Sequence, residues 1–348
     1  RRCFTLLRPR STTAVDVSAP PPAPAPPVQP GLSRNTGSAA DKALAEGDAA
    51  YEADAFDKAA EAYRKASKLA PKDPAPIVGL ARVAIARTGV TTDFASSPNH
   101  PEITAAAREL ERAVRLDASY APARIELGRA LLILGKAEQA IASLRKAVSL
   151  APADAEAHSA LAIALLATGN GAEALTEMTR AAELDPNNPA RQTNLGTVLM
   201  LRAQPREAVR AYERAAVMTP SDPRVRSALG AAYLSLHEVS RALPHLRLAV
   251  QLAPNNASYH SNLGYALQLA LDHAGAISEY KRAIELDPRL GSAWINLGTA
   301  LAQTGQRDEA RKAFQKALEI DPSDPRAKTN LQELADLADA GPPQGATK

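Results

Sequence analysis

The sequence predicts an all-α fold, a solenoid of about eight helix-turn-helix repeats followed by one capping helix. Three observations predict it. Leucine returns every 34 residues, small residues and prolines return with the same period, and the chain is apolar but poor in aromatic residues. With 45% apolar and only 4% aromatic residues, the composition suits many small helices better than one large core.

Equivalent residues form columns with this period. The leucine column contains Leu127, Leu161, Leu195, Leu229, Leu263, Leu297 and Leu331. The next position holds Gly128, Gly196, Gly230, Gly264 and Gly298, with Ala162 in the remaining repeat. One alanine column holds Ala140, Ala174, Ala208, Ala242, Ala276 and Ala310, and a second holds Ala147, Ala181, Ala215, Ala249, Ala283 and Ala317. A proline column holds Pro152, Pro186, Pro220, Pro254, Pro288 and Pro322.

Each column predicts a structural role. Leu297 and Leu301 are four residues apart and share one helix face. After a polar turn, Ala310 and Phe314 share a second face, so two helices face each other in every repeat. We expect the glycine and alanine positions to be small because two helix backbones approach closely there. The proline, here Pro322, ends the second helix and turns the chain into the next repeat.

One set of residues resembles the signature of the tetratricopeptide repeat (TPR) family, a helix-turn-helix of 34 residues. The set comprises Trp294, Leu297, Gly298, Leu301, Ala310, Phe314, Ala317 and Pro322. The resemblance covers about residues 40–340 and implies a right-handed α-solenoid whose first helices line a concave groove. Most other repeats replace the tryptophan with Arg124, His158, Gln192, Arg226 or His260. Packing at that corner should therefore vary.

The columns also divide the chain. We expect an Arg- and Pro/Ala-rich disordered segment over residues 1–39 and a disordered tail over 341–348. The predicted repeats are 40–73, 74–120 with an inserted turn at 89–102, 121–154, 155–188, 189–222, 223–256, 257–290 and 291–324, and a capping helix follows at 325–340.

Charge and composition exclude several classes of function. The formal charge of +3 comes from residues 1–39, and the rest of the chain is almost neutral, so no basic stripe favours nucleic acid. No run of 18 apolar residues predicts a transmembrane helix. Cys3 is the only cysteine, which leaves the redox compartment open. The chain suits the cytoplasm or a periplasmic, envelope-associated location, and an organelle-targeting peptide is disfavoured.

No catalytic set is evident, and we expect no enzyme activity, no cofactor and no metal. The six histidines fall at unrelated repeat positions, and no pair has metal-ligand spacing on one helix. His158 and His260 occupy the position of the family's tryptophan, which favours packing as their role. Function is therefore expected to depend on the shape and chemistry of a surface.

The expected surface is the groove. The residue before each repeated leucine is rotated by about 100° from the core face and points into the groove. Four of these residues are asparagines, whose amides can both donate and accept hydrogen bonds along an extended peptide, as in the groove of the O-GlcNAc transferase repeats that this region resembles. Local structure is the alternative role of these asparagines. The predicted groove residues are Asn194, Thr197, Leu201, Asn262, Tyr265, Leu269, Asn296, Thr299, Gln303 and Asn330.

The sequence therefore predicts a non-catalytic scaffold or adaptor that binds an extended, largely uncharged peptide or protein partner. A clamp for acidic chaperone tails is disfavoured because Arg129, Arg224 and Arg326 are too dispersed. Two alternatives stay open: an envelope, secretion or pilus assembly factor tethered by the Pro/Ala linker, and the repeat region of a larger O-GlcNAc-transferase-like enzyme. The partner, the oligomeric state, lipidation of the N-terminus and the role of the insertion also stay open.

Overall fold

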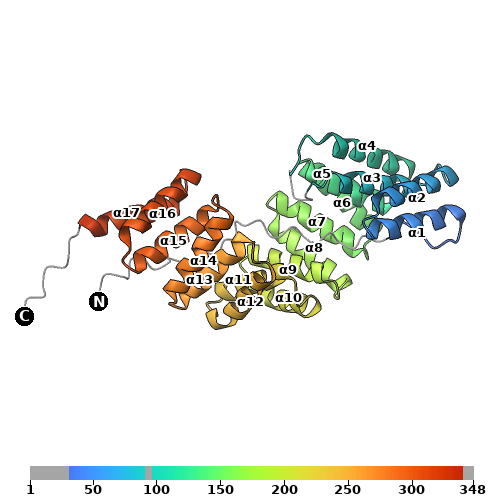
Figure 1. The fold of residues 1–348 in the computed structure, drawn as a ribbon. Helices are drawn as coiled ribbons and strands as arrows, with labels where there is room; N and C mark the ends of the chain where they lie inside the picture. The colour runs from blue at the N-terminus through green and yellow to red at the C-terminus, as the bar shows by residue number, and fades with distance from the viewer. Residues whose placement is uncertain (1–30, 91–95, 340–348) are drawn as a thin grey trace, which may run out of the picture. The chain divides into compact units, whose positions relative to one another are not determined.

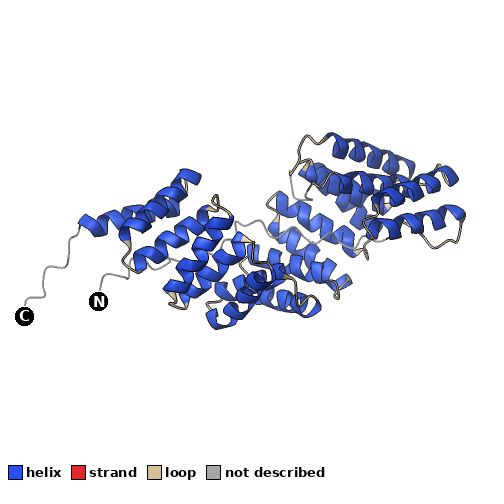
Figure 2. Ribbon diagram, viewed as in Figure 1, coloured by secondary structure: helices blue, strands red, loops and turns tan. Residues whose placement is uncertain are grey.

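A computed structural model describes residues 31–90 and 96–339 of the chain. The predictions made for residues 1–30, for 91–95 of the insertion and for 340–348 lie outside these ranges. Within them the fold is an all-α repeat solenoid of seventeen helices without a strand, as predicted (Figure 2).

The helices alternate as first and second members of the repeats. The first helices are α1 (Ala39–Glu52), α3 (Ala75–Arg87), α5 (Ala121–Ile133), α7 (Ala155–Ala167), α9 (Pro189–Leu201), α11 (Pro223–Ser235), α13 (Ala257–Leu269) and α15 (Gly291–Gln303). The second helices are α2 (Phe56–Leu69), α4 (Pro101–Leu116), α6 (Ala137–Leu150), α8 (Gly171–Leu184), α10 (Pro205–Met218), α12 (Val239–Leu252), α14 (His273–Leu286) and α16 (Arg307–Ile320), and α17 (Pro325–Asp339) comes last.

The helix boundaries follow from local chemistry. Asp154, Asn188, Asp222 and Asn256 precede first helices, and their side chains accept hydrogen bonds from the unpaired N–H groups of the first turn. The predicted insertion lengthens the connection between α3 and α4. Pro101 and Glu102, assigned to the insertion from the sequence, belong to α4, because proline fits the first turn of a helix.

The described residues form two compact units that divide between Ala203 and Gln204. In each unit, helices that follow one another in the chain pack side by side (Figure 1). The boundary falls between α9 and α10, inside the predicted repeat 189–222.

Large side chains of the second helices explain the small residues of the first helices. A Cβ atom added to Gly298 would lie 2.5 Å from Cε1 of Phe314, and one added to Gly230 would lie 2.5 Å from Cγ of Leu246. The sequence had suggested close approach of two backbones. The structure shows that the nearest atoms belong to a buried ring or branched side chain that packs directly on the glycine, and at Gly230 the carbonyl oxygen of Ala242 also lies 3.4 Å from the added Cβ.

Tyr63 shows that one side chain can serve two repeats. Its ring lies against Gly47 of α1 and against Gly79 of α3, and a Cβ added at either position would come within 2.7 Å of the ring. The ring is fully buried, and its hydroxyl donates to Asp48 Oδ1 at 2.9 Å. The same packing therefore joins α1 to α2 and this first repeat to the second.

Residues 31–38 differ from the predicted disordered segment, because they pack against α1. Leu32 is only 2% exposed, and its N–H donates to Asp48 Oδ2 at 2.6 Å. The N–H groups of Arg34 and Thr36 both donate to Asp41, each at 2.7 Å. This packing is not predictable from the sequence, because the buried group is a single leucine at the end of a Pro/Ala-rich stretch. The segment covers part of the first repeat.

The glycine contacts make a testable prediction within one helix. Replacing Gly298 with alanine should destabilise the fold by about 1–3 kcal/mol, because the ring of Phe314 must move. Gly291, at the start of the same helix, is the matched control, since an added Cβ would lie at an ordinary 3.7 Å from Ile320. Urea denaturation of both variants measures the difference, and equal midpoints would show that the ring does not rest on Gly298.

Candidate protein-interaction surface

The first helices of the unit beginning at residue 204 form a continuous surface. Here α11 contacts α13, α13 contacts α15, and α15 contacts α17. The helices α13 and α15 contain no Asp, Glu, Lys or Arg, whereas their partners α14 and α16 carry several of each sign. We call six side chains of α13 and α15 the uncharged face; five are half-buried and one, that of Asn296, is buried. They are Asn262, Tyr265, Leu269, Asn296, Thr299 and Gln303.

Two asparagines of the predicted set join successive first helices. The amide of Asn262 donates to Ser227 Oγ of α11 at 3.2 Å. The amide of Asn330 in α17 donates to Thr299 Oγ1 of α15 at 3.3 Å, and this hydroxyl in turn donates to a backbone carbonyl of its own helix. These contacts support the local structural role that the sequence left as an alternative.

Asn296 and Tyr265 differ from these two. Among the described residues neither side chain has a polar partner within hydrogen-bonding distance, although Asn296 is only 9% exposed and Tyr265 is half-buried. Burial raises the pKa of Tyr265, so its phenol stays protonated and remains a donor at neutral pH. The two groups can therefore bond a ligand without first breaking an internal bond.

A chain of hydrogen bonds holds the side chain of Gln303. Gln268 donates to Gln303 Oε1 at 2.8 Å and accepts from the buried hydroxyl of Tyr280 at 2.8 Å. This chain of bonds runs from α14 through α13 to α15. It fixes the spacing of the two helices that carry the uncharged face, with Leu269 half-buried beside it.

Three predicted residues belong to the other unit. Asn194 and Thr197 of α9 are half-buried, and the Thr197 hydroxyl donates to the carbonyl of Thr193 at 3.0 Å. Leu201, the last residue of the helix, is 52% exposed. The structure thus groups six of the predicted residues on α13 and α15 and Asn330 beside them on α17, while these three lie on α9 of the unit ending at residue 203.

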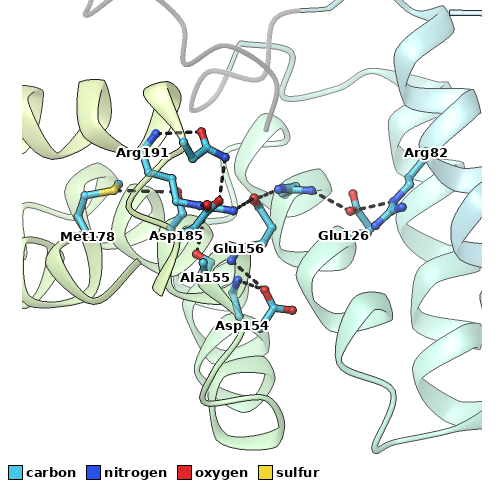
Figure 3. A network of polar contacts seen from close by, with 12 residues as sticks. Arg82, Glu126, Asp154, Ala155, Glu156, Met178, Asp185 and Arg191 are labelled. Carbon is cyan, nitrogen blue, oxygen red and sulfur yellow. Dashed lines mark hydrogen bonds and ion pairs between the residues drawn. The ribbon is translucent and has the colours of Figure 1, made fainter. Parts of the chain in front are cut away.

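The unit ending at residue 203 has a charged network that sequence reasoning missed. It joins four successive first helices through alternating charges in the order Arg82, Glu126, Arg129, Glu156, Arg191 (Figure 3). Arg82 Nε lies 3.0 Å from Glu126 Oε1, and Arg191 Nη2 lies 3.3 Å from Glu156 Oε2. We call these five residues the charge ladder.

The side chains of the charge ladder are largely buried, and their charges are paired with one another. Glu126 is 3% exposed, and its Oε1 accepts hydrogen bonds from the guanidinium groups of Arg82 and Arg129. Burial alone would raise the pKa of Glu126, but Arg129 and Arg82 outweigh it and hold the pKa below the ordinary glutamate value. Glu126 occupies the position before the repeated leucine that the sequence assigned to the groove, yet it is a structural tie. Gly79 and Glu126 hold the same position in their repeats, directly before the leucine. Arg82 and Arg129 each come three residues later, so they are also equivalent.

The corner occupied by the family's tryptophan has a shared chemistry. In six repeats its side chain places a nitrogen at hydrogen-bonding distance from the carbonyl six residues earlier, in the turn that ends the preceding repeat. The pairs are Arg124 with Ala118, His158 with Pro152, Gln192 with Pro186, Arg226 with Pro220, His260 with Pro254 and Trp294 with Pro288. An N–H donor is what these side chains have in common.

The two histidines at this corner are structural, as the sequence favoured. His260 Nδ1 lies 2.6 Å from Glu279 Oε2, and His260 Nε2 lies 2.9 Å from the carbonyl oxygen of Pro254. His158 repeats this arrangement with Glu177 and Pro152. Each imidazole thus ties its own second helix to the preceding repeat.

The arginines considered for a carboxylate clamp are committed elsewhere. Arg129 is part of the charge ladder. Arg224 and Arg326 each bond the capping aspartate two residues earlier, Asp222 at 2.7 Å and Asp324 at 2.8 Å. The first helices therefore present no unneutralised guanidinium at these three positions.

Among the described residues, no group of three His, Cys, Asp or Glu side chains could hold a metal ion. Over the same part of the chain, every helix is too short or too polar to cross a bilayer.

The comparisons with known proteins agree with this geometry. One sequence profile described as tetratricopeptide repeat matches residues 131–197 and 269–334, and a second with the same description matches residues 102–154 and 193–257. The chain belongs to the tetratricopeptide repeat family. TPR proteins bind protein partners, and the TPR fold is generally a non-catalytic interaction scaffold. No curated protein matches the sequence.

Solved TPR structures share the fold at low identity. The APC/C hetero-tetramer Cut9-Hcn1 contains a chain with 17% identity and a TM-score of 0.62, matched over 88% of this chain and 57% of that one. PilF of Pseudomonas aeruginosa has 23% identity and a TM-score of 0.54, matched over 64% of this chain and 98% of that one. This chain thus spans little more than half of the first structure's chain, and both likenesses show the fold alone.

The charge ladder predicts a large loss of stability when one of its carboxylates is replaced by an amide. Replacing Glu156 with glutamine should destabilise the unit by about 3–5 kcal/mol, because Arg129 and Arg191 lose a buried carboxylate. Glu173→Gln is the matched control: its ion pair with Arg145 is about half exposed on both sides and should contribute less than about 1 kcal/mol. Guanidinium denaturation compares them, and similar losses in the two variants would contradict a buried network.

The lowered pKa of Glu126 also predicts acid sensitivity. A carboxyl whose folded-state pKa lies below its unfolded value of about 4.5 stabilises the fold at neutral pH. That stability is lost as the pH falls from about 4.5 through the lower folded-state pKa, because folding must then compete with protonation. Thermal unfolding between pH 7 and pH 3 measures the loss. In Glu126→Gln, the steep acid-dependent part of the curve should be reduced.

The corner donor gives a third prediction. His260→Ala should cost about 1–3 kcal/mol, since the Pro254 carbonyl and Glu279 both lose a partner. His260→Trp should recover part of this stability, because Trp294 makes the equivalent bond to Pro288 at 3.0 Å. If tryptophan is no better than alanine in thermal unfolding, the N–H donor is not what the corner requires.

Proposed function

We propose that this protein is a non-catalytic interaction scaffold that binds an extended, uncharged peptide segment along the uncharged face of α13 and α15. One observation carries the proposal: the two consecutive first helices α13 and α15 have no Asp, Glu, Lys or Arg and carry the amides of Asn262 and Asn296 and the hydroxyl of Tyr265. Side chains of this kind bond peptide backbones without reading the partner's charge.

The available hydrogen bonds suit a modest affinity. About four bonds at roughly 1 kcal/mol each correspond to a dissociation constant near 1 mM, so apolar contacts such as Leu269 must add the rest. Charged partner segments bind less well because the face offers their charges no counter-ion and still removes their water. Asn194, Thr197 and Leu201 on α9 form a second candidate contact of the same uncharged type in the other unit.

A peptide selected on the intact chain from a random 12-residue display library tests the proposal. We expect selected sequences to be poor in Lys, Arg, Asp and Glu. The double variant Asn262→Ala and Asn296→Ala should weaken binding of one such synthetic peptide by about 30-fold, which corresponds to two bonds of roughly 1 kcal/mol. Isothermal titration calorimetry measures the change.

The control is Asn170→Ala, which removes an asparagine from the α7–α8 turn of the other unit, where the side-chain amide donates to the neighbouring Thr168 Oγ1 at 2.9 Å. Circular dichroism checks that helicity is kept in every variant. Unchanged affinity in the double variant, with helicity intact, would show that peptides bind elsewhere.

A further inference from the structure

Residues 31–37, which we call the strap, lie on α1 as a bound peptide would. The strap forms no helix or strand. The N–H groups of Leu32 and Ser33 donate to Asp48 Oδ2 at 2.6 Å and 3.0 Å, and two later N–H groups of the strap donate to Asp41, which comes earlier in α1. The strap therefore runs antiparallel to α1 and is held mainly through its main chain.

Two side chains of the strap add specific contacts. Leu32 is 2% exposed and belongs to the hydrophobic core of the unit ending at residue 203. The half-exposed guanidinium of Arg34 lies 3.1 Å from Asp73 and 5.0 Å from the centre of the Tyr120 ring. A leucine and an arginine two residues later are thus the side chains that anchor the strap.

The strap covers a face of α1 that has other roles in later repeats. Asp48 directly follows Gly47, the small residue of α1 on which a second-helix side chain packs. Arg129 of the charge ladder follows Gly128 in the same way, and Tyr265 of the uncharged face holds this position in α13. In the first repeat, the equivalent position is occupied by a segment of the chain itself.

We propose that the strap is an exchangeable internal ligand, and that the site beneath it binds a partner segment in which an arginine comes two residues after a leucine. Asp41, Asp48 and Asp73 supply acceptors for the N–H groups and the guanidinium of that partner, so the site takes a basic segment. The site belongs to the unit ending at residue 203 and differs in charge from the uncharged face. The inference therefore does not rest on the proposed function.

The strap can leave without unfolding α1. Ser38, directly after the strap, caps α1 because its hydroxyl accepts from the N–H of Asp41 at 3.1 Å. Asp48 keeps the hydroxyl of Tyr63 as a donor at 2.9 Å. Leu32 is the single buried residue of the strap, and segments with few buried apolar contacts open at a small cost in free energy.

The vacated site favours a replacement for the strap. The N–H groups of Arg34 and Thr36 hold the pKa of Asp41 below the ordinary aspartate value, so its carboxylate is charged at neutral pH. When the strap leaves, this carboxylate loses those donors. A partner segment restores them with its own main-chain N–H groups.

Tethering protects the strap from a free peptide of the same chemistry. A segment attached to its site by a short flexible connection has an effective concentration on the order of 1 mM. A dilute free peptide therefore binds the wild-type chain weakly. It should bind well once the anchoring side chains of the strap are removed.

A fluorescently labelled peptide GLSRNTGS, the sequence of residues 31–38, tests the inference on the full chain. In the double variant Leu32→Ala with Arg34→Ala the strap lacks its anchors, and the peptide should bind at least about tenfold more tightly than to the wild-type chain. Fluorescence anisotropy measures both affinities. A peptide carrying the same two alanines should not bind the double variant.

Two further variants locate the contact. Arg64→Ala with Leu69→Ala makes the same two substitutions at exposed positions of α2, and this control should bind the peptide as weakly as the wild-type chain. Adding Asp41→Asn to the double variant of the strap should weaken peptide binding about tenfold, because an amide oxygen accepts N–H groups less strongly than a carboxylate does.

An undetectable peptide affinity in the double variant, with helicity unchanged in circular dichroism, would overturn the inference, because the strap would then be a fixed part of the first repeat. If the double variant loses helicity, hydrogen exchange of the wild-type chain decides. The strap amides should exchange at least about tenfold faster than the amides in the middle of α2, and equal protection would overturn the inference. A wild-type chain that is dimeric in solution, with a double variant that is monomeric, would also overturn it, since the ligand would then be the strap of a second copy.

Discussion

The rest of the structure depends on one packing contact, a large second-helix side chain resting on a small first-helix residue. Phe314 on Gly298 and Tyr280 on Gly264 set the separation of the two helices in their repeats. Because the ring packs against the glycine, the opposite side of the first helix faces away from the second helix. The uncharged face of α13 and α15 exists for this reason.

Polar groups add to the apolar packing between successive repeats. The corner side chain, whether His260 or Trp294, reaches a nitrogen back to the carbonyl of the preceding turn. The charge ladder also joins successive repeats, through ion pairs between four first helices of one unit. In the other unit, amides and hydroxyls such as Asn262 and Ser227 join the first helices. Ion pairs thus join the first helices in one unit, and uncharged hydrogen bonds join them in the other. Only the uncharged contacts leave hydrogen-bond donors for a ligand.

The helix-turn-helix repeats were predictable because the residues that form them recur with a fixed period. Leu297, Gly298 and Phe314 recur at fixed spacing, so the sequence alone indicates which helices pair. It could not show why Gly298 is small, since a nearby backbone and a nearby ring both exclude a Cβ. Packing of Leu32 was also missed, because one leucine beside a proline-rich stretch gives no period.

The polar contacts were less predictable because their partners lie far apart in the chain. Glu126 is 44 residues from Arg82 and Glu156 is 35 residues from Arg191, so neither pair has the spacing of a local helix pair. The equivalent positions of Arg82 and Arg129 were the available signal, and the insertion between α3 and α4 concealed it. Asn262 and Asn296 hold equivalent positions, and a serine stands 35 residues before each (Ser227 and Ser261), yet only Asn262 bonds its serine, a difference that the sequence does not indicate.

The central claim is that ligands bind the first helices and not the more highly charged second helices. A photo-crosslinking residue placed at Thr299 of α15, compared with one at the exposed Lys312 of α16, tests this most directly with the library-selected peptide. The account predicts crosslinked peptide at position 299 and none above background at position 312. Crosslinking at position 312 alone would contradict it.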